Sequence, residues 1–212
     1  MKRSLISLIF LFSLPCFAAQ NALTDTGEEV ILNDDGTWKY RSGKSSGSAA
    51  ASGKIKTNSK KFYKPKDSSF LIKSKKNKSA IWINPKKWTF TKSEPTKATE
   101  YKLRLKDKSL YGMMITEEIE LPLKTISDAA LTNAQRAAPN AKINKREYRK
   151  VNGLKVLYQE ITGSIQKVNF TYISYNFSNK SGSTQLVMYT ANNLVNKYRP
   201  EIFKLLNGLV TQ

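Results

Sequence analysis

Four strand-like runs in the C-terminal part of the chain limit its fold more strongly than any other feature. They cover residues 143–151, 154–161, 168–177 and 185–190. The segments between them are short and rich in glycine and polar residues: Asn152-Gly153, Gly163-Ser164 and residues 178–182. Antiparallel strands need only a short turn between them, whereas parallel strands need a crossover of roughly a dozen residues or more. The pattern therefore predicts an antiparallel meander.

The preceding segment adds further strands and a helix. Apolar residues at 70–74 and 80–83 flank a polar turn, and residues 99–106 alternate apolar and charged side chains before a partner strand at 110–119. Pro122 begins a stretch with helical spacing that Pro139 ends, and we expect Pro200 to begin a last helix. The fold class predicted is α+β, with an antiparallel sheet packed by helices in a sandwich.

Changes in composition divide the chain into four segments. Two strand-like runs around Asn33-Asp34-Asp35-Gly36 predict a β-hairpin. The residues after it are rich in Ser, Gly, Ala and Lys, which cannot form a core and favour a flexible linker. The expected organisation is a signal peptide at 1–18, a hairpin segment at 19–40, a linker at 41–61 and the main domain at 62–212.

The first residues have the layout of a signal peptide. Lys2 and Arg3 precede an apolar run of about ten residues, which is shorter than the roughly 20 that span a bilayer. We expect cleavage after Ala18, a periplasmic or secreted location, and no transmembrane helix in the cleaved chain. A lipid anchor on Cys16 is the alternative, although Leu14-Pro15 is a poor match to the small residue that should precede the cysteine.

The residue types that are missing exclude several kinds of chemistry. The sequence has no histidine, and its one cysteine, Cys16, lies in the predicted signal peptide. Serine and cysteine triads with histidine, histidine-bearing zinc sites and disulfides are therefore excluded from the mature chain. We expect no cofactor, no metal and no enzyme activity. A carboxylate- or lysine-dependent enzyme remains the alternative, with Glu118 and Glu120 as a carboxylate pair on one strand face.

The charge of the chain points to anionic partners. It has 36 basic and 16 acidic residues, a formal net charge of +20. Anionic lipid, lipopolysaccharide or an acidic protein would attract such a surface, and solubility alone is the competing explanation. Nucleic acid is not expected, because an exported protein seldom meets it and the sequence has no RNA-recognition signature. The predicted anion-binding residues are Lys73, Lys75, Lys76, Lys78, Lys142, Lys145, Arg146, Arg149 and Lys150.

Two resemblances extend this interpretation. The order of elements, with the 83–88 turn, the Asn152-Gly153 connection and the Leu205-Leu206-Asn207-Gly208-Leu209 ending, resembles the Mog1/PsbP-like fold, which includes DcrB-like exported bacterial proteins. That resemblance implies an accessory or binding subunit of the cell envelope without a catalytic motif. Residues 27–38 resemble a Gly-x-x-Val-x-Leu-x-x-Asp-Gly-Thr-Trp segment found in exported proteins of unknown function. A structural subunit of an envelope complex, marked by an exposed apolar patch, is a further alternative.

Overall fold

A computed structural model describes residues 20–23, 29–32, 38–40, 54–94 and 97–212. The chain divides into two compact units, Met1–Lys44 and Ser45–Gln212. The predicted signal peptide and residues 41–53 of the predicted linker lie outside the described residues, as does the turn of the predicted hairpin.

The N-terminal unit contains three short antiparallel strands in the order β1-β2-β3. They are β1 (Gln20–Leu23), β2 (Glu29–Leu32) and β3 (Trp38–Tyr40). β2 and β3 pair with Leu32 opposite Trp38, which is the hairpin that the sequence predicts. β1 pairs with the other side of β2 and was not predicted.

The main domain is built on an eight-stranded sheet in the order β4-β10-β11-β12-β13-β9-β8-β7. Its members are β4 (Lys56–Phe62), β7 (Trp88–Lys92), β8 (Thr99–Leu105), β9 (Tyr111–Glu117), β10 (Lys142–Val151), β11 (Leu154–Ile165), β12 (Val168–Asn179) and β13 (Gly182–Ala191). The predicted meander is confirmed as β10 to β13, with antiparallel pairing throughout. β11 and β12 are longer than predicted, so their turn lies at Gln166-Lys167 and not at Gly163-Ser164.

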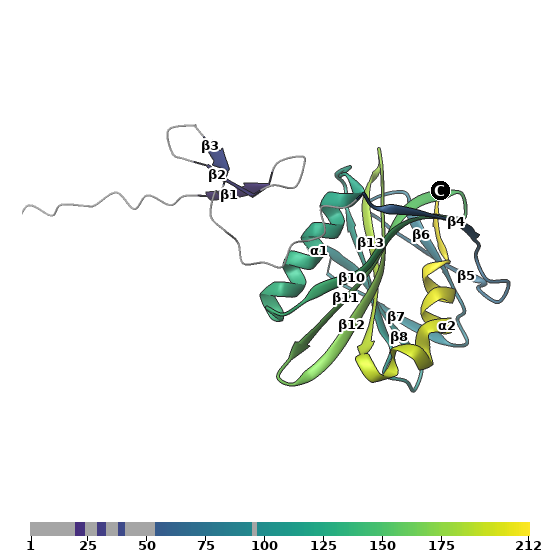
Figure 1. The fold of residues 1–212 in the computed structure, drawn as a ribbon. Helices are drawn as coiled ribbons and strands as arrows, with labels where there is room; N and C mark the ends of the chain where they lie inside the picture. Colours follow the sequence, from purple (N-terminus) through teal and green to yellow (C-terminus); the bar gives the residue numbers. More distant parts are fainter. Residues whose placement is uncertain (1–19, 24–28, 33–37, 41–53, 95–96) are drawn as a thin grey trace, which may run out of the picture. The chain divides into compact units, whose positions relative to one another are not determined.

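A second, smaller sheet and two helices cover the large sheet. The sheet has the order β14-β6-β5, formed by β5 (Phe70–Lys73), β6 (Ser79–Ile83) and β14 (Leu209–Thr211). Helix α1 (Leu123–Ala137) lies on one face of β10, β11 and β12, whereas α2 (Val195–Leu206) lies on the other face (Figure 1). The α+β sandwich is therefore confirmed.

Helix α2 begins five residues before the predicted start. A short 3-10 helix, η1 (Asn192–Leu194), leads into it, and Pro200 lies inside the helix. Val195 and Tyr198, which precede the proline, are buried in the main core. Their burial compensates for the backbone hydrogen bond that a proline removes, so proline was a misleading start signal here.

The predicted linker extends too far, and the large sheet is not purely antiparallel. Residues 56–61, expected in the linker, form most of β4, which pairs in parallel with β10. Most side chains of β4 are exposed, so this strand forms without the apolar run that usually marks one. The sheet is mixed because its edge strand comes from this N-terminal segment.

Candidate anion-binding surface

The basic run on β10 does not form one patch. Successive side chains of a strand point to opposite faces, and a register shift between Ile143 and Lys145 changes the alternation there. Lys145 and Arg149 lie on the α2 side of the sheet, where both approach the ring of Tyr158. Arg146 lies on the α1 side, where it pairs with Asp128 at 2.8 Å. The predicted cluster is therefore divided between two faces.

Arg149 is a buried structural residue and does not belong to the anion-binding surface. Its side chain is 5% exposed and lies 3.5 Å from the ring centroid of Tyr158. Its guanidinium pairs with Glu147 at 2.7 Å and donates to the Tyr175 hydroxyl at 3.3 Å. Burial opposes the charge, but these hydrogen bonds raise the pKa of Arg149 overall. The sequence prediction failed because a buried arginine cannot be told from an exposed one by spacing alone.

The other basic residues of that run differ in what they contact. Arg146 is mostly buried beside its partner on α1, so little of its charge faces solvent. Lys145 is exposed and lies 3.6 Å from Glu147. Lys142 and Lys150 are exposed and form no ion pair with a carboxylate that the structure describes. Of the five basic residues of β10, only these two present a charge without a described carboxylate partner.

Three lysines meet side by side where β4, β10 and β11 are adjacent. Lys150 of β10 lies directly opposite Lys61 of β4 and directly opposite Lys155 of β11. All three are exposed, and none forms an ion pair with the carboxylates of the described residues. Like charges directly opposite each other on neighbouring strands destabilise a sheet. We call these residues the lysine row, and its local charge is one that a bound anion would neutralise.

A shallow pocket of about 160 Å³ opens at one end of the lysine row. It is lined by Lys61, Phe62, Tyr63, Lys150 and Gly153. Tyr63 is 65% exposed and lines the pocket together with the two lysines. A cation beside an exposed tyrosine suits a membrane headgroup, because tyrosine side chains favour the interface between water and lipid.

The turn beneath this pocket is fixed by hydrogen bonds. Asn152 and Gly153 have φ values of 49° and 87°, and such positive values are what the type I′ turn favoured by Asn-Gly requires. The Asn152 side chain donates to the carbonyl oxygens of Asn207 and Leu209 at 2.7 and 2.8 Å. It also accepts from the backbone N–H of Lys64 at 2.8 Å. The turn therefore holds β4 and β10 in a fixed register beside the C-terminal strand.

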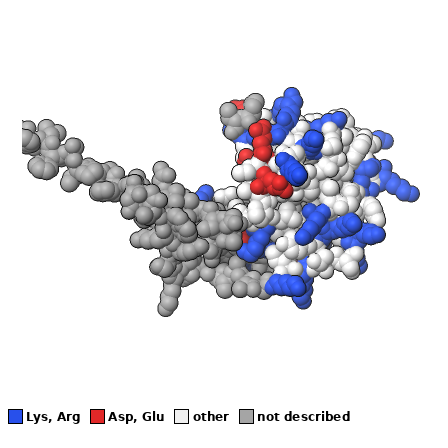
Figure 2. Space-filling view, turned by 90° about the horizontal axis from the view of Figure 1, so that it is seen from above, with Lys and Arg blue, Asp and Glu red and all other residues white. Residues whose placement is uncertain are grey.

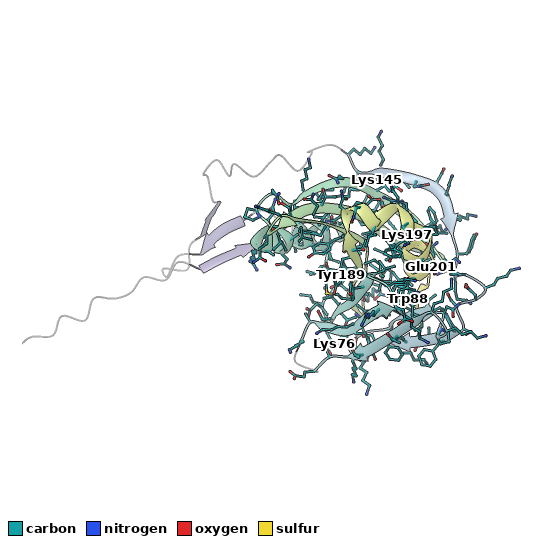
Figure 3. The ribbon with its side chains drawn as sticks, turned by 90° about the horizontal axis from the view of Figure 1, so that it is seen from below. Lys76, Trp88, Lys145, Tyr189, Lys197 and Glu201 are labelled. Atoms are coloured by element: carbon teal, nitrogen blue, oxygen red, sulfur yellow. The ribbon has the colours of Figure 1, made fainter. Side chains whose placement is uncertain are left out.

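The second predicted group of lysines surrounds the turn between β5 and β6. A buried carboxylate holds this turn: Glu100 accepts from the Ser74 hydroxyl and the Lys75 backbone N–H, both at 2.7 Å. Lys73, Lys75 and Lys78 are exposed, and Lys76 is half-buried with its ammonium donating to the Lys97 carbonyl. Lys76 lies across the domain from Lys145, so the two predicted groups form separate surfaces (Figure 3).

Acidic side chains do not form a second kind of site in the described part of the chain. β9 ends at Glu117, and Glu118 and Glu120 are exposed in the loop that follows, so they do not share a strand face as predicted. No cluster of three or more potential metal ligands occurs among the described residues. Figure 2 shows one end of the molecule, where basic side chains are spread over the surface and acidic ones gather in a small group.

Sequence reasoning identified Lys150 but missed its two partners in the lysine row. Lys61 was assigned to the linker, and Lys155 was not among the predicted anion-binding residues. Lys61 and Lys155 are distant from each other in sequence, and each is brought beside Lys150 by strand pairing. The signal available was the Asn152-Gly153 turn, which places Lys150 and Lys155 opposite each other on its two strands.

Comparison with known proteins shows the fold and leaves the function open. No family model matches the sequence, and no curated protein matches it. The solution structure of cyanobacterial PsbP (CyanoP) from Synechocystis sp. PCC 6803 matches with a TM-score of 0.52 and 10% identity, over 68% of this chain and 92% of that one. The main domain therefore has a PsbP/Mog1-like fold.

Two further solved structures are similar at lower TM-scores. The protein PA94 of unknown function from Pseudomonas aeruginosa matches at 0.43 and 11% identity, over 68% of this chain and 96% of that one. A Bacteroides thetaiotaomicron protein matches at 0.45 and 7% identity, over 68% of this chain and 49% of that one. Among the described residues, no helix combines the length and apolar character needed to cross a membrane.

Proposed function

We propose that this protein is a non-catalytic, exported accessory module that binds the phosphate groups of anionic envelope lipids, lipopolysaccharide included, through the lysine row. The observation that carries this proposal is the placement of Lys61, Lys150 and Lys155 directly opposite one another without a described carboxylate partner. The exposed Tyr63 adds a side chain suited to the lipid interface.

Protection of the sheet edge does not account for this arrangement. Lysines on an edge strand prevent edge-to-edge aggregation, and β4 is such a strand. That explanation applies to Lys61, but Lys150 and Lys155 lie on the second and third strands from the edge. Their direct opposition lowers the stability of the sheet. A binding role gives a reason for keeping all three charges together.

The expected strength of the interaction is moderate and dependent on salt. A lysine near an anionic membrane contributes about 1 kcal/mol, so three contribute about 3 kcal/mol, or roughly a hundredfold in affinity. Because exposed charges are screened over about 8 Å at physiological ionic strength, binding should weaken steeply as salt increases. Lysine suits a surface of many phosphates, since it acts as a point charge with no fixed geometry.

The predicted signal peptide and the similarity of fold support the rest of the proposal. The charged and apolar layout of residues 1–18 supports export to the periplasm or beyond. The PsbP/Mog1-like fold is compatible with an accessory role, and we extend this to a similarity with DcrB-like exported proteins. A fold by itself does not determine function, so the lysine row and not the fold supports the binding role.

The test is binding of residues 19–212 to vesicles of phosphatidylglycerol, vesicles of phosphatidylcholine, and lipopolysaccharide, each over a salt titration. We expect binding to the two anionic surfaces only, and a loss of roughly a hundredfold in K61Q/K150Q/K155Q. The matched control K108Q/K180Q/K197Q removes the same charge from three exposed lysines on other elements. Equal losses in both triple variants would contradict a specific site.

A further inference from the structure

The other edge of the large sheet is exposed and differs in character from β4. β7 (Trp88–Lys92) pairs only with β8, and four of its five residues are exposed. Phe90 is 39% exposed, and its ring centroid lies 5.7 Å from that of Phe70 of β5, which is 45% exposed. Large exposed aromatics beside an open edge are typical of a surface that another chain covers.

The hydrogen-bonding pattern of β7 leaves backbone groups directed away from the sheet. Lys106 donates its N–H to the Lys87 carbonyl, and Ser93 donates to the Glu100 carbonyl. Hydrogen-bonded pairs alternate along an antiparallel ladder, so Thr89 and Thr91 also face β8. The backbone N–H and C=O groups of Phe90 and Lys92 therefore point outward, where an added strand would bind.

The devices that normally block an edge are few on β7. Among its five residues there is one lysine and no proline, and its register with β8 has no shift. Threonine and the aromatic residues of this strand have high β propensity. By contrast, β4 on the opposite edge has lysine at three of its seven residues. Of the two edges of the large sheet, the one formed by β7 therefore has fewer features that block strand addition.

Cations flank the β7 edge on both faces of the sheet. Lys92 lies beside Lys75, and this contact lowers the pKa of Lys92. On the opposite face, Lys102 and Arg104 lie directly across from Thr91 and Thr89, and both are exposed. Glu100, the carboxylate closest to these groups along β8, is buried and occupied by three hydrogen bonds.

We propose that the β7 edge binds an extended acidic segment of a partner protein by strand addition. Main-chain hydrogen bonds to Phe90 and Lys92 would supply affinity, and alternate side chains would supply specificity. Side chains on the Phe70 side of the added strand are apolar opposite Phe90. Those on the other side are acidic, so that they reach Lys102 and Arg104. A second copy of this chain is disfavoured as the occupant, because it carries the same cations.

The probe is a capped nonapeptide of alternating valine and glutamate, labelled for fluorescence anisotropy. We expect it to bind the wild-type protein, and we expect the peptide with glutamine in place of glutamate to bind about tenfold more weakly. Two further peptides carry N-methyl groups on either the valine or the glutamate nitrogens. Because only alternate residues of an added strand bond to the edge, one N-methylated peptide should lose binding and the other should keep it.

Two variants of Lys92 separate its backbone donor from its charge. K92P removes an N–H that faces away from β8, which an edge strand tolerates, whereas K92Q removes the charge alone. We expect K92Q to bind the peptide nearly as well as the wild type, because Lys92 lies on the Phe90 face and not on the face of the glutamates. We expect K92P to weaken binding at least tenfold, with circular dichroism confirming that both variants fold. K61Q/K150Q/K155Q should bind the peptide like the wild type. Equal binding of both N-methylated peptides, or loss of binding in that triple variant, would overturn the proposal.

Discussion

The two edge strands of the large sheet, β4 and β7, both have backbone groups without a neighbouring strand, but their side chains differ. β4 presents lysines along an exposed edge, and a partly buried network beneath it fixes its position: Asn58 donates to Glu147, which pairs with Arg149. β7 presents threonine and an exposed phenylalanine and has no such network of ion pairs in the described residues. An edge that repels other strands can bind a charged surface, whereas an edge that remains open can bind a strand.

The strongest test of this difference removes the anchor of β4. In R149L, Glu147 remains half-buried without its main cation, and the stacking on Tyr158 is lost. Breaking a buried pair by removing one partner costs about 3 to 5 kcal/mol. We expect a decrease of this size in the free energy of unfolding, measured by urea denaturation. The control K145L removes an exposed charge from the same strand and should change it by less than about 1 kcal/mol.

A substitution on the other edge should make β7 resemble β4. F90K places a lysine at the centre of the open edge and removes the ring contacts with Phe70 and Tyr101. The aromatic contacts are worth about 1 kcal/mol, so the loss of stability should be small. Affinity for the valine-glutamate peptide should fall at least tenfold, since the exposed apolar surface is lost. Unchanged peptide affinity would show that Phe90 takes no part in binding.

We expect the lysine row to lower the stability of the domain while it provides binding to anionic lipid. In K61Q/K150Q/K155Q, two directly opposed like-charge pairs disappear. Each such pair costs roughly 0.2 to 1 kcal/mol, and each kcal/mol shifts the melting temperature by about 2 to 4 °C in a domain of this size. We expect the variant to melt slightly higher than the wild type by calorimetry while it loses vesicle binding. A lower melting temperature would mean that the three lysines stabilise the fold.

Acid should loosen β4 before β7. Burial raises the pKa of Glu147, but hydrogen bonds from Asn58 and Arg149 bring it below its ordinary value of 4.5. The stability that this carboxylate provides is therefore complete above its unfolded pKa and is lost as the pH falls through its folded pKa. Hydrogen exchange near pH 3 should accelerate in β4 relative to β7. E147Q should remove the difference between acidic and neutral pH.

Much of the fold follows from local patterns, and the errors have physical causes. The meander and α1 were predictable because the Asn152-Gly153 turn and the Pro122–Pro139 interval are determined by local backbone preferences. β4 was not, because its lysines match a solvated linker and its pairing with β10 is distant in sequence. β7 was missed because a five-residue run after a turn gives little periodicity. Burial of Arg149 depends on contacts with α2 and β12 that no local pattern contains.

The most direct test of the central claim is an amide NMR titration of residues 19–212 with phosphatidylglycerol nanodiscs at low and high salt. The account predicts shift or intensity changes centred on Lys61, Lys150 and Lys155, with β7 unaffected and the changes reversed at high salt. Changes centred on the β5–β6 turn or on β7, or none at low salt, would contradict the assignment of the lysine row as the anionic binding surface.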